Sequence, residues 1–153
     1  APTTKALEPA SNEYDAAYLG VSKFESGGGG LLSTARDYLR FSQMMLNGGQ
    51  LDGERILSPK TVDLMTANHL GDISMGFGQR GAGFGLGFGL VLDPGRAGEI
   101  SSTGEYNWGG IAGTRFWVDP EEELIGIFMV QSVPHRTRLA GDFKVLAYQA
   151  LVE

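Results

Sequence analysis

Apolar and polar residues recur with two different periods along this chain, and the change of period divides it into helical and strand segments. Between residues 34 and 47 the apolar residues follow helical spacing, which predicts an amphipathic helix. Its broad apolar face consists of Tyr38, Leu39, Phe41, Met44, Met45 and Leu46. Ser33 or Thr34 can cap the start of this helix, and Asn47-Gly48-Gly49 can end it in a left-handed conformation.

A second, short helix is expected to run from Pro59 through Met65. Ser58 supplies a side-chain acceptor at the N-cap and Pro59 takes the first helical position, as is typical of helix starts. Residues 1–26, in contrast, contain two prolines, several small polar residues and no clear periodicity. We therefore expect a loop-rich lead-in without a regular element.

Strand patterns dominate the second half of the chain. Glycine alternates with large apolar residues over residues 83–90, and residues 84–92 are predicted to form one strand. Because glycine is a poor strand former, another backbone or a helix is expected to pack closely against one face of this strand. Two further strands, over residues 113–118 and 124–131, are predicted to form a hairpin around the turn 119–123.

The last element is a closing helix over residues 142–151. Its apolar side consists of Phe143, Leu146, Ala147, Ala150 and Leu151, and it needs a sheet to cover. The elements together predict an α+β fold, with antiparallel sheet strands, a C-terminal helix and a preceding helical segment. The predicted organisation is a lead-in (1–26) followed by one domain part (27–153), which contains a helical segment (27–70), sheet strands (71–131) and the closing helix (132–153).

The composition is that of one soluble globular domain. The 153 residues are 42% hydrophobic and 20% charged, which suffices to bury a core. The formal net charge of -6 disfavours nucleic acid, because phosphates require clustered cations. The longest apolar stretch, Leu124–Val130, is far too short to cross a bilayer, so no membrane association is expected. With no cysteine, the compartment stays open between a bacterial cytoplasm and periplasm.

Little in the sequence supports metal or cofactor chemistry, and we expect neither. His69 and His135 are the only histidines, and both are expected to be structural or exposed. Glu121–Glu123 falls on the predicted hairpin turn, where a solvated charge run is the ordinary explanation. Gly27–Gly30 is followed by no Lys-Ser or Lys-Thr, so we interpret it as a flexible turn rather than a phosphate cradle.

Three stretches in a fixed order carry a family resemblance. They are Ser26–Tyr38 with Met44–Gly49, then Leu57–Val62 with Met65 and Asn68–Leu70, and finally Gly104–Pro120. Together they resemble the serine β-lactamase-like hydrolases, which include class C β-lactamases, penicillin-binding proteins and related esterases. The resemblance implies the C-terminal half of such an enzyme, with an incomplete β-lactamase/transpeptidase-like fold.

The resemblance also implies a serine nucleophile in an S-x-x-K motif and a tyrosine partner, and the chain contains neither. The residues three places before the four lysines are Pro2, Gly20, Leu57 and Gly141. No tyrosine has asparagine or serine two places later. In this family both elements precede the Gly-rich segment, and the chain starts without a methionine. The expected partner is therefore a missing N-terminal half, fused or separate, that carries S-x-x-K.

The family's third motif is K-T-G or a substitute, and Trp108-Gly109-Gly110 corresponds to it here. By resemblance, the N–H of Ile111 is the backbone oxyanion donor, and Trp108, Gly109 and Gly110 surround it. Tyr106 and Trp108 are the predicted substrate-binding residues. Taken alone, the two glycines could mark a bulge, but the flanking match favours the motif. The missing lysine and threonine favour esters over β-lactams.

These observations predict part of a serine hydrolase that acts on small esters or amides through an acyl-serine and is inactive alone. The alternative is a non-catalytic binding or structural module of the same fold. A sheet face and a helix built to pack against an absent segment would expose apolar surface. We therefore expect the isolated chain to be marginally stable and prone to self-association.

Overall fold

The computed structural model describes residues 26–73, 80–133, 135 and 137–152. The chain divides into two compact units, Ala1–Thr34 and Ala35–Glu153. In the first unit the described residues contain a turn in which the Gly30 N–H donates to the Ser26 carbonyl at 2.8 Å. The predicted lead-in lies almost entirely outside the described residues, so its extent stays a prediction.

Two helices and a short hairpin open the second unit. Helix α2 spans Ala35–Leu46 and helix α3 spans Pro59–Met65, with the two-residue strands β1 (Gln50–Leu51) and β2 (Glu54–Arg55) between them. Both helices confirm the sequence prediction to within about one residue. Ser58 caps α3 as expected, because its Oγ accepts a backbone N–H of the first turn at 3.1 Å.

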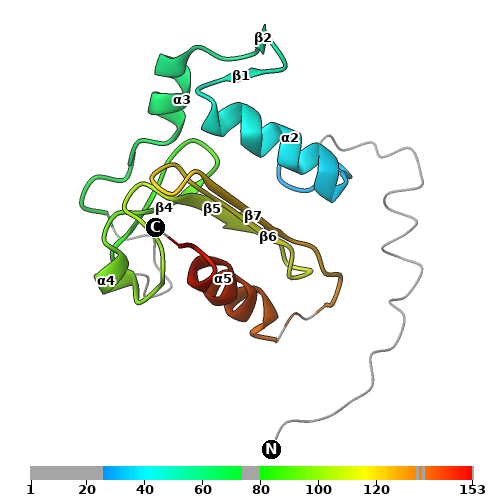
Figure 1. Ribbon diagram of the computed structural model, residues 1–153, viewed down its shortest axis with the longest axis vertical. Helices are drawn as coiled ribbons and strands as arrows, with labels where there is room; N and C mark the ends of the chain where they lie inside the picture. The colour runs from blue at the N-terminus through cyan, green and yellow to red at the C-terminus, as the bar shows by residue number, and fades with distance from the viewer. Residues whose placement is uncertain (1–25, 74–79, 134, 136, 153) are drawn as a thin grey trace, which may run out of the picture. The chain divides into compact units, whose positions relative to one another are not determined.

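The rest of this unit forms a five-stranded antiparallel sheet in the order β3-β4-β5-β6-β7, followed by helix α5 (Figure 1). The bounds are β3 Ala82–Phe84, β4 Gly89–Val91, α4 Pro94–Ala97, β5 Tyr106–Gly109, β6 Arg115–Asp119, β7 Leu124–Phe128 and α5 Leu139–Gln149. The fold is therefore α+β with an antiparallel sheet and a C-terminal helix, as the sequence predicts. Within the described ranges, no helix has the length and apolar character needed to cross a membrane.

The prediction of a single strand over residues 84–92 is wrong, because this segment takes part in a hairpin. Between β3 and β4 the Gly85 N–H donates to the Phe88 carbonyl at 2.8 Å. Gly87 adopts a φ of 93°, the left-handed conformation that such a tight turn uses. Glycine alternating with apolar residues is also typical of a continuous strand, so the pattern alone did not reveal the turn.

The close packing expected on this segment is confirmed. The Leu86 N–H donates to the Met65 carbonyl at 2.9 Å, and a side chain at Gly85 would collide with that carbonyl. The end of α3 therefore lies directly against the hairpin. The second predicted hairpin is also confirmed, since β6 and β7 pair along their whole length, although β7 ends at Phe128 rather than at residue 131.

Helix α2 covers one face of the sheet and forms the apolar core with it (Figure 1). The Tyr38 ring meets the Phe116 ring edge-on, with the centroids 4.8 Å apart. The buried core residues are Met44, Met45, Val62, Phe88, Leu90, Tyr106, Phe116 and Val118. Burying a large apolar side chain contributes roughly 1.5–3 kcal/mol, so this layer is the main source of hydrophobic stabilisation.

Helix α5 covers the opposite face, and only part of its predicted apolar side takes part (Figure 1). Phe143, on that side, contacts the rings of Trp117 and Phe128. It begins at Leu139 rather than at residue 142. The residues that it buries are Ala140, Lys144 and Tyr148. Leu146, which the apolar pattern assigns to the covered side, is 64% exposed. The prediction is incomplete because this face of the sheet also presents two buried carboxyl groups to the helix.

These carboxyl groups belong to Glu105 and Asp119, which are both fully buried. Lys144 Nζ donates to Glu105 Oε1 at 2.8 Å. The Tyr148 hydroxyl lies 2.9 Å from Glu105 Oε2 and 2.6 Å from Asp119 Oδ2. Three backbone N–H groups also donate to Asp119. We refer to Glu105, Asp119, Lys144 and Tyr148 as the buried polar network.

The Tyr148 hydroxyl contacts two carboxyl groups but carries a single proton. It can donate to only one of them at a time. Burial raises the pKa of Glu105, and the nearby Lys144 ammonium offsets this effect only in part. Burial also raises the pKa of Tyr148, so the phenol keeps its proton. Glu105 therefore keeps its carboxyl proton to a higher pH than an ordinary glutamate does.

Unfolding as a function of pH should reveal this proton. Because the pKa of Glu105 is raised in the folded state, folded protein binds the proton more tightly than unfolded protein. The resulting stabilisation is complete below the ordinary pKa of 4.5 and is lost as the pH rises through the folded pKa. In urea titrations, we expect the free energy of unfolding to fall with rising pH by about 1.4 kcal/mol per unit of pKa difference.

The Glu105→Gln variant should lack this part of the pH dependence, because glutamine does not titrate. Glu54→Gln, on the exposed strand β2, is the matched control and should follow the wild type. Parallel pH profiles for wild type and Glu105→Gln would contradict the assignment of the proton.

Candidate functional site

Strand β5 leads to the candidate site, because one of its edges is open where the strand ends. It pairs with β6 over its full length, from Tyr106 to Gly109. Its pairing with β4 stops at Asn107. From Trp108 onward, no other strand of the described sheet pairs with the β4 side of this strand.

Between β5 and β6, Gly110 and Thr114 enclose a three-residue loop, residues 111–113, that contains the predicted oxyanion donor. The Gly110 N–H donates to the Thr114 carbonyl at 2.8 Å, and the Gly113 N–H donates to the Gly110 carbonyl at 2.9 Å. Gly113 adopts a φ of 93°, as the last position of this loop type requires. Ile111 is 84% exposed, and its N–H has no acceptor among the residues that the structure describes.

The predicted motif, Trp108-Gly109-Gly110, lies at this open edge. Trp108 is 47% exposed, and its indole meets the Phe84 ring edge-on at 5.1 Å. Gly109 and Gly110 carry no side chain, so the backbone beside the indole stays accessible. An unpaired N–H next to accessible backbone is the arrangement that can stabilise the oxyanion of an acyl group.

Tyr106, predicted to bind substrate, has a different place. It is 2% exposed, and its ring packs against Phe88 at 5.3 Å in the apolar core. Burial raises the pKa of its hydroxyl group, which has no hydrogen-bond partner in the described part of the chain. The structure therefore gives Tyr106 a supporting role beneath the strand instead of a surface that a substrate could contact.

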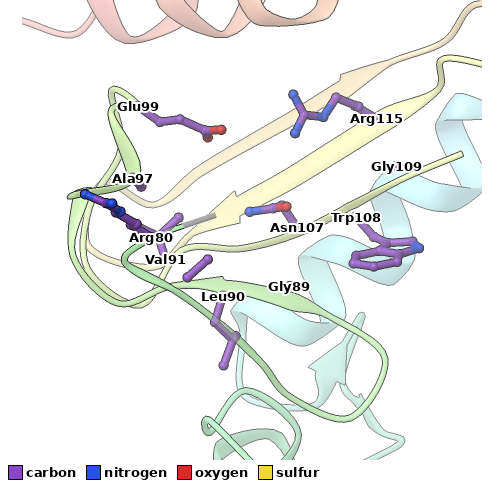
Figure 2. A pocket seen from close by; sticks show the side chains of 11 residues that line it. Arg80, Gly89, Leu90, Val91, Ala97, Glu99, Asn107, Trp108, Gly109 and Arg115 are labelled. Atoms are coloured by element: carbon purple, nitrogen blue, oxygen red, sulfur yellow. The ribbon is translucent and has the colours of Figure 1, made fainter. Parts of the chain in front are cut away.

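A hollow of about 200 Å³ with a mixed polar and apolar lining lies at the motif (Figure 2). Asn107 and Gly109 of β5 contribute to its lining, and Glu99 and Arg115 point toward each other across it. Arg115 forms no ion pair with any described residue. Over the same described ranges, no three His, Asp or Glu side chains are grouped so that they could hold a metal ion.

Two features around the site were not predicted. The buried polar network reaches the strand, because Asn107 Nδ2 donates to Glu105 Oε1 at 3.1 Å. His135 lies against the turn, where a side chain at Gly113 would collide with its imidazole. Lys144 and Tyr148 are spaced to share one helix face, a signal that could have suggested the network. No local pattern links His135 with Gly113.

Comparisons with known proteins show the family to which the chain belongs. The family model described as Beta-lactamase matches residues 1–150, nearly the whole chain. Protein Rv1367c of Mycobacterium tuberculosis (strain ATCC 25618 / H37Rv) is 39% identical over 120 residues. This match covers 72% of the present chain but only 30% of that protein. The chain thus spans less than a third of the length of this curated relative.

Two solved structures resemble the chain over part of their length. EstCE1, described as a hydrolase with promiscuous acyltransferase activity, aligns with a TM-score of 0.74 and 23% identity over 88% of this chain and 34% of its own. Simvastatin synthase (LovD) from Aspergillus terreus aligns with a TM-score of 0.74 and 22% identity over 100% of this chain and 42% of its own. At these identities the likeness shows the fold alone, as a partial match.

Proposed function

Because the chain belongs to the β-lactamase family, we propose that it is the C-terminal segment of a serine hydrolase that acts on esters or amides through an acyl-serine. In this proposal the chain supplies the third active-site motif and one oxyanion donor, but not the nucleophile. The observation that carries the proposal is the exposed Ile111 N–H in the turn after β5, which has no acceptor among the residues that the structure describes.

The chemistry follows from the needs of acyl transfer. A serine oxygen attacks the substrate carbonyl, and the negative charge that develops on the carbonyl oxygen must be stabilised by hydrogen-bond donors fixed in advance. The Ile111 N–H is one donor, and the backbone of the nucleophile's own segment provides the second. Removing a single donor typically costs about 10²–10³ in turnover, so this segment contributes strongly to the rate without touching the nucleophile.

The residues around the donor favour esters over β-lactams. Trp108, Gly109 and Gly110 stand where the lactamase motif carries lysine, threonine and glycine, so no ammonium group is available to bind a substrate carboxylate at this position. The half-exposed Trp108 indole offers an apolar wall for an acyl chain. The description of EstCE1 as a hydrolase with promiscuous acyltransferase activity also supports esters over β-lactams.

The proposed partner is the segment that carries the nucleophile. The lysines of this chain have no serine three places earlier, so S-x-x-K comes from a preceding segment of a longer protein or from a separate polypeptide. The chain covers less than half of the length of each of these relatives, which supports this part of the proposal. A non-catalytic module of the same fold is the second candidate, favoured only by the absence of the nucleophile from the chain.

The first test uses a chromogenic short-chain ester. The isolated chain should leave its hydrolysis at the uncatalysed rate, because no nucleophile is present. A longer protein that includes the S-x-x-K segment should hydrolyse it at an enzyme-like rate, on the order of 1 per second or faster. Enzyme-like turnover by the isolated chain would contradict the proposal, and an inactive longer protein would favour the non-catalytic module.

The second test changes Gly110 to valine in the longer protein. The branched side chain should block the approach of an acyl group and lower kcat/KM by about 10²-fold or more while the fold is retained. One internal contact needs a control, because a Cβ at Gly110 would lie 2.7 Å from Thr114 Oγ1. The double variant Gly110→Val/Thr114→Ala removes that contact.

If the double variant remains inactive, the block is at the acyl site, as proposed. Recovery of activity in the double variant would assign the loss to the internal contact instead. Unchanged activity in Gly110→Val itself would remove residues 108–111 from the site.

A further inference from the structure

Two residues that lie between β7 and α5 in the sequence, Ser132 and His135, contact the turn that carries Ile111. The Ser132 N–H donates to the Ala112 carbonyl at 3.0 Å. The imidazole of His135 lies on Gly113, so closely that a side chain there would collide with the ring. Both contacts fall on the three-residue loop, on residues that the β5–β6 ladder does not pair.

The His135 ring is held by packing more than by hydrogen bonds. Nε2 has one partner, the Thr137 hydroxyl at 3.3 Å. Nδ1 is buried and has no partner in the described part of the chain. A buried nitrogen without a hydrogen-bond partner is unfavourable. Packing contacts, rather than hydrogen bonds, therefore hold the ring in this position. Its flat face fits against Gly113, which is itself buried and requires glycine at its φ of 93°.

This support matters because an oxyanion donor acts only when its direction is fixed before the reaction. Within the described residues the Ile111 N–H makes no hydrogen bond of its own, so its direction is set by the rest of the turn. The bond from Gly113 to Gly110 closes the turn on one side. Ser132 and His135 restrain it on the other.

We propose that His135 is a positioning residue, which holds the turn from Gly110 to Gly113 so that the Ile111 N–H points toward the developing oxyanion. This inference rests on the proposed function, and it assigns His135 no contact with substrate. It differs from a general structural role because removing the ring should affect the turn and the turnover number, while the sheet and substrate binding stay intact.

The first experiment measures backbone amide exchange by NMR in the 153-residue chain. In His135→Ala, the exchange of the Gly113 and Ser132 amides should accelerate by about tenfold or more, since both bonds depend on the restrained turn. The Trp117 amide in β6 should keep its protection, which also shows that the variant folds. His69→Ala removes the only other histidine, which is exposed, and should leave the turn amides unchanged. Unchanged exchange in His135→Ala would overturn the proposal.

The second experiment measures ester hydrolysis by the longer protein. His135→Ala should lower kcat by about tenfold or more with KM unchanged, and His135→Phe, which restores a flat ring, should recover most of kcat. A rise in KM alone, or equal losses in both variants, would overturn the positioning role. If the wild-type longer protein hydrolyses neither esters nor amides, the proposed function fails, and the exchange comparison still decides whether His135 holds the turn.

Discussion

The structure depends on the contact of Tyr148 with Glu105 and Asp119 inside the buried polar network. Glu105 directly precedes β5 and Asp119 ends β6, while Tyr148 and Lys144 belong to α5. The network is therefore the place where the last helix meets the central strands. A buried carboxyl group without partners is strongly unfavourable, so α5 can dock only where its lysine and tyrosine reach both carboxyl groups.

This constraint also bears on the candidate site. On one face of the sheet, strand β5 contacts the buried polar network through Asn107. On the other face, Tyr106 of the same strand is buried in the apolar core. Because β4 stops pairing at Asn107, the strand continues into the motif with one edge open. The strand thus leads into a turn whose Ile111 N–H has no acceptor among the described residues, and in the proposed function this N–H is the oxyanion donor.

Residue patterns predicted those parts of the molecule that local sequence determines. Helical spacing and caps located α2 and α3, and the β-prone segments located the β6–β7 hairpin. The β3–β4 turn was missed because its glycines also fit a strand. The covered side of α5 was predicted only in part: Phe143 contacts the sheet, but Lys144 and Tyr148 are buried because the carboxyl groups that they meet are distant in sequence. The motif residues were predicted by resemblance, whereas the burial of Tyr106 and the contact of His135 with Gly113 depend on tertiary packing.

The most direct test of the account is a structure of the longer protein with a phosphonate ester bound covalently to its serine. The phosphoryl oxygen then occupies the place of the oxyanion. If Ile111 supplies the oxyanion donor, this oxygen lies about 2.7–3.1 Å from its backbone nitrogen. A phosphoryl oxygen bound by other donors, with the Ile111 N–H directed to solvent, would contradict it.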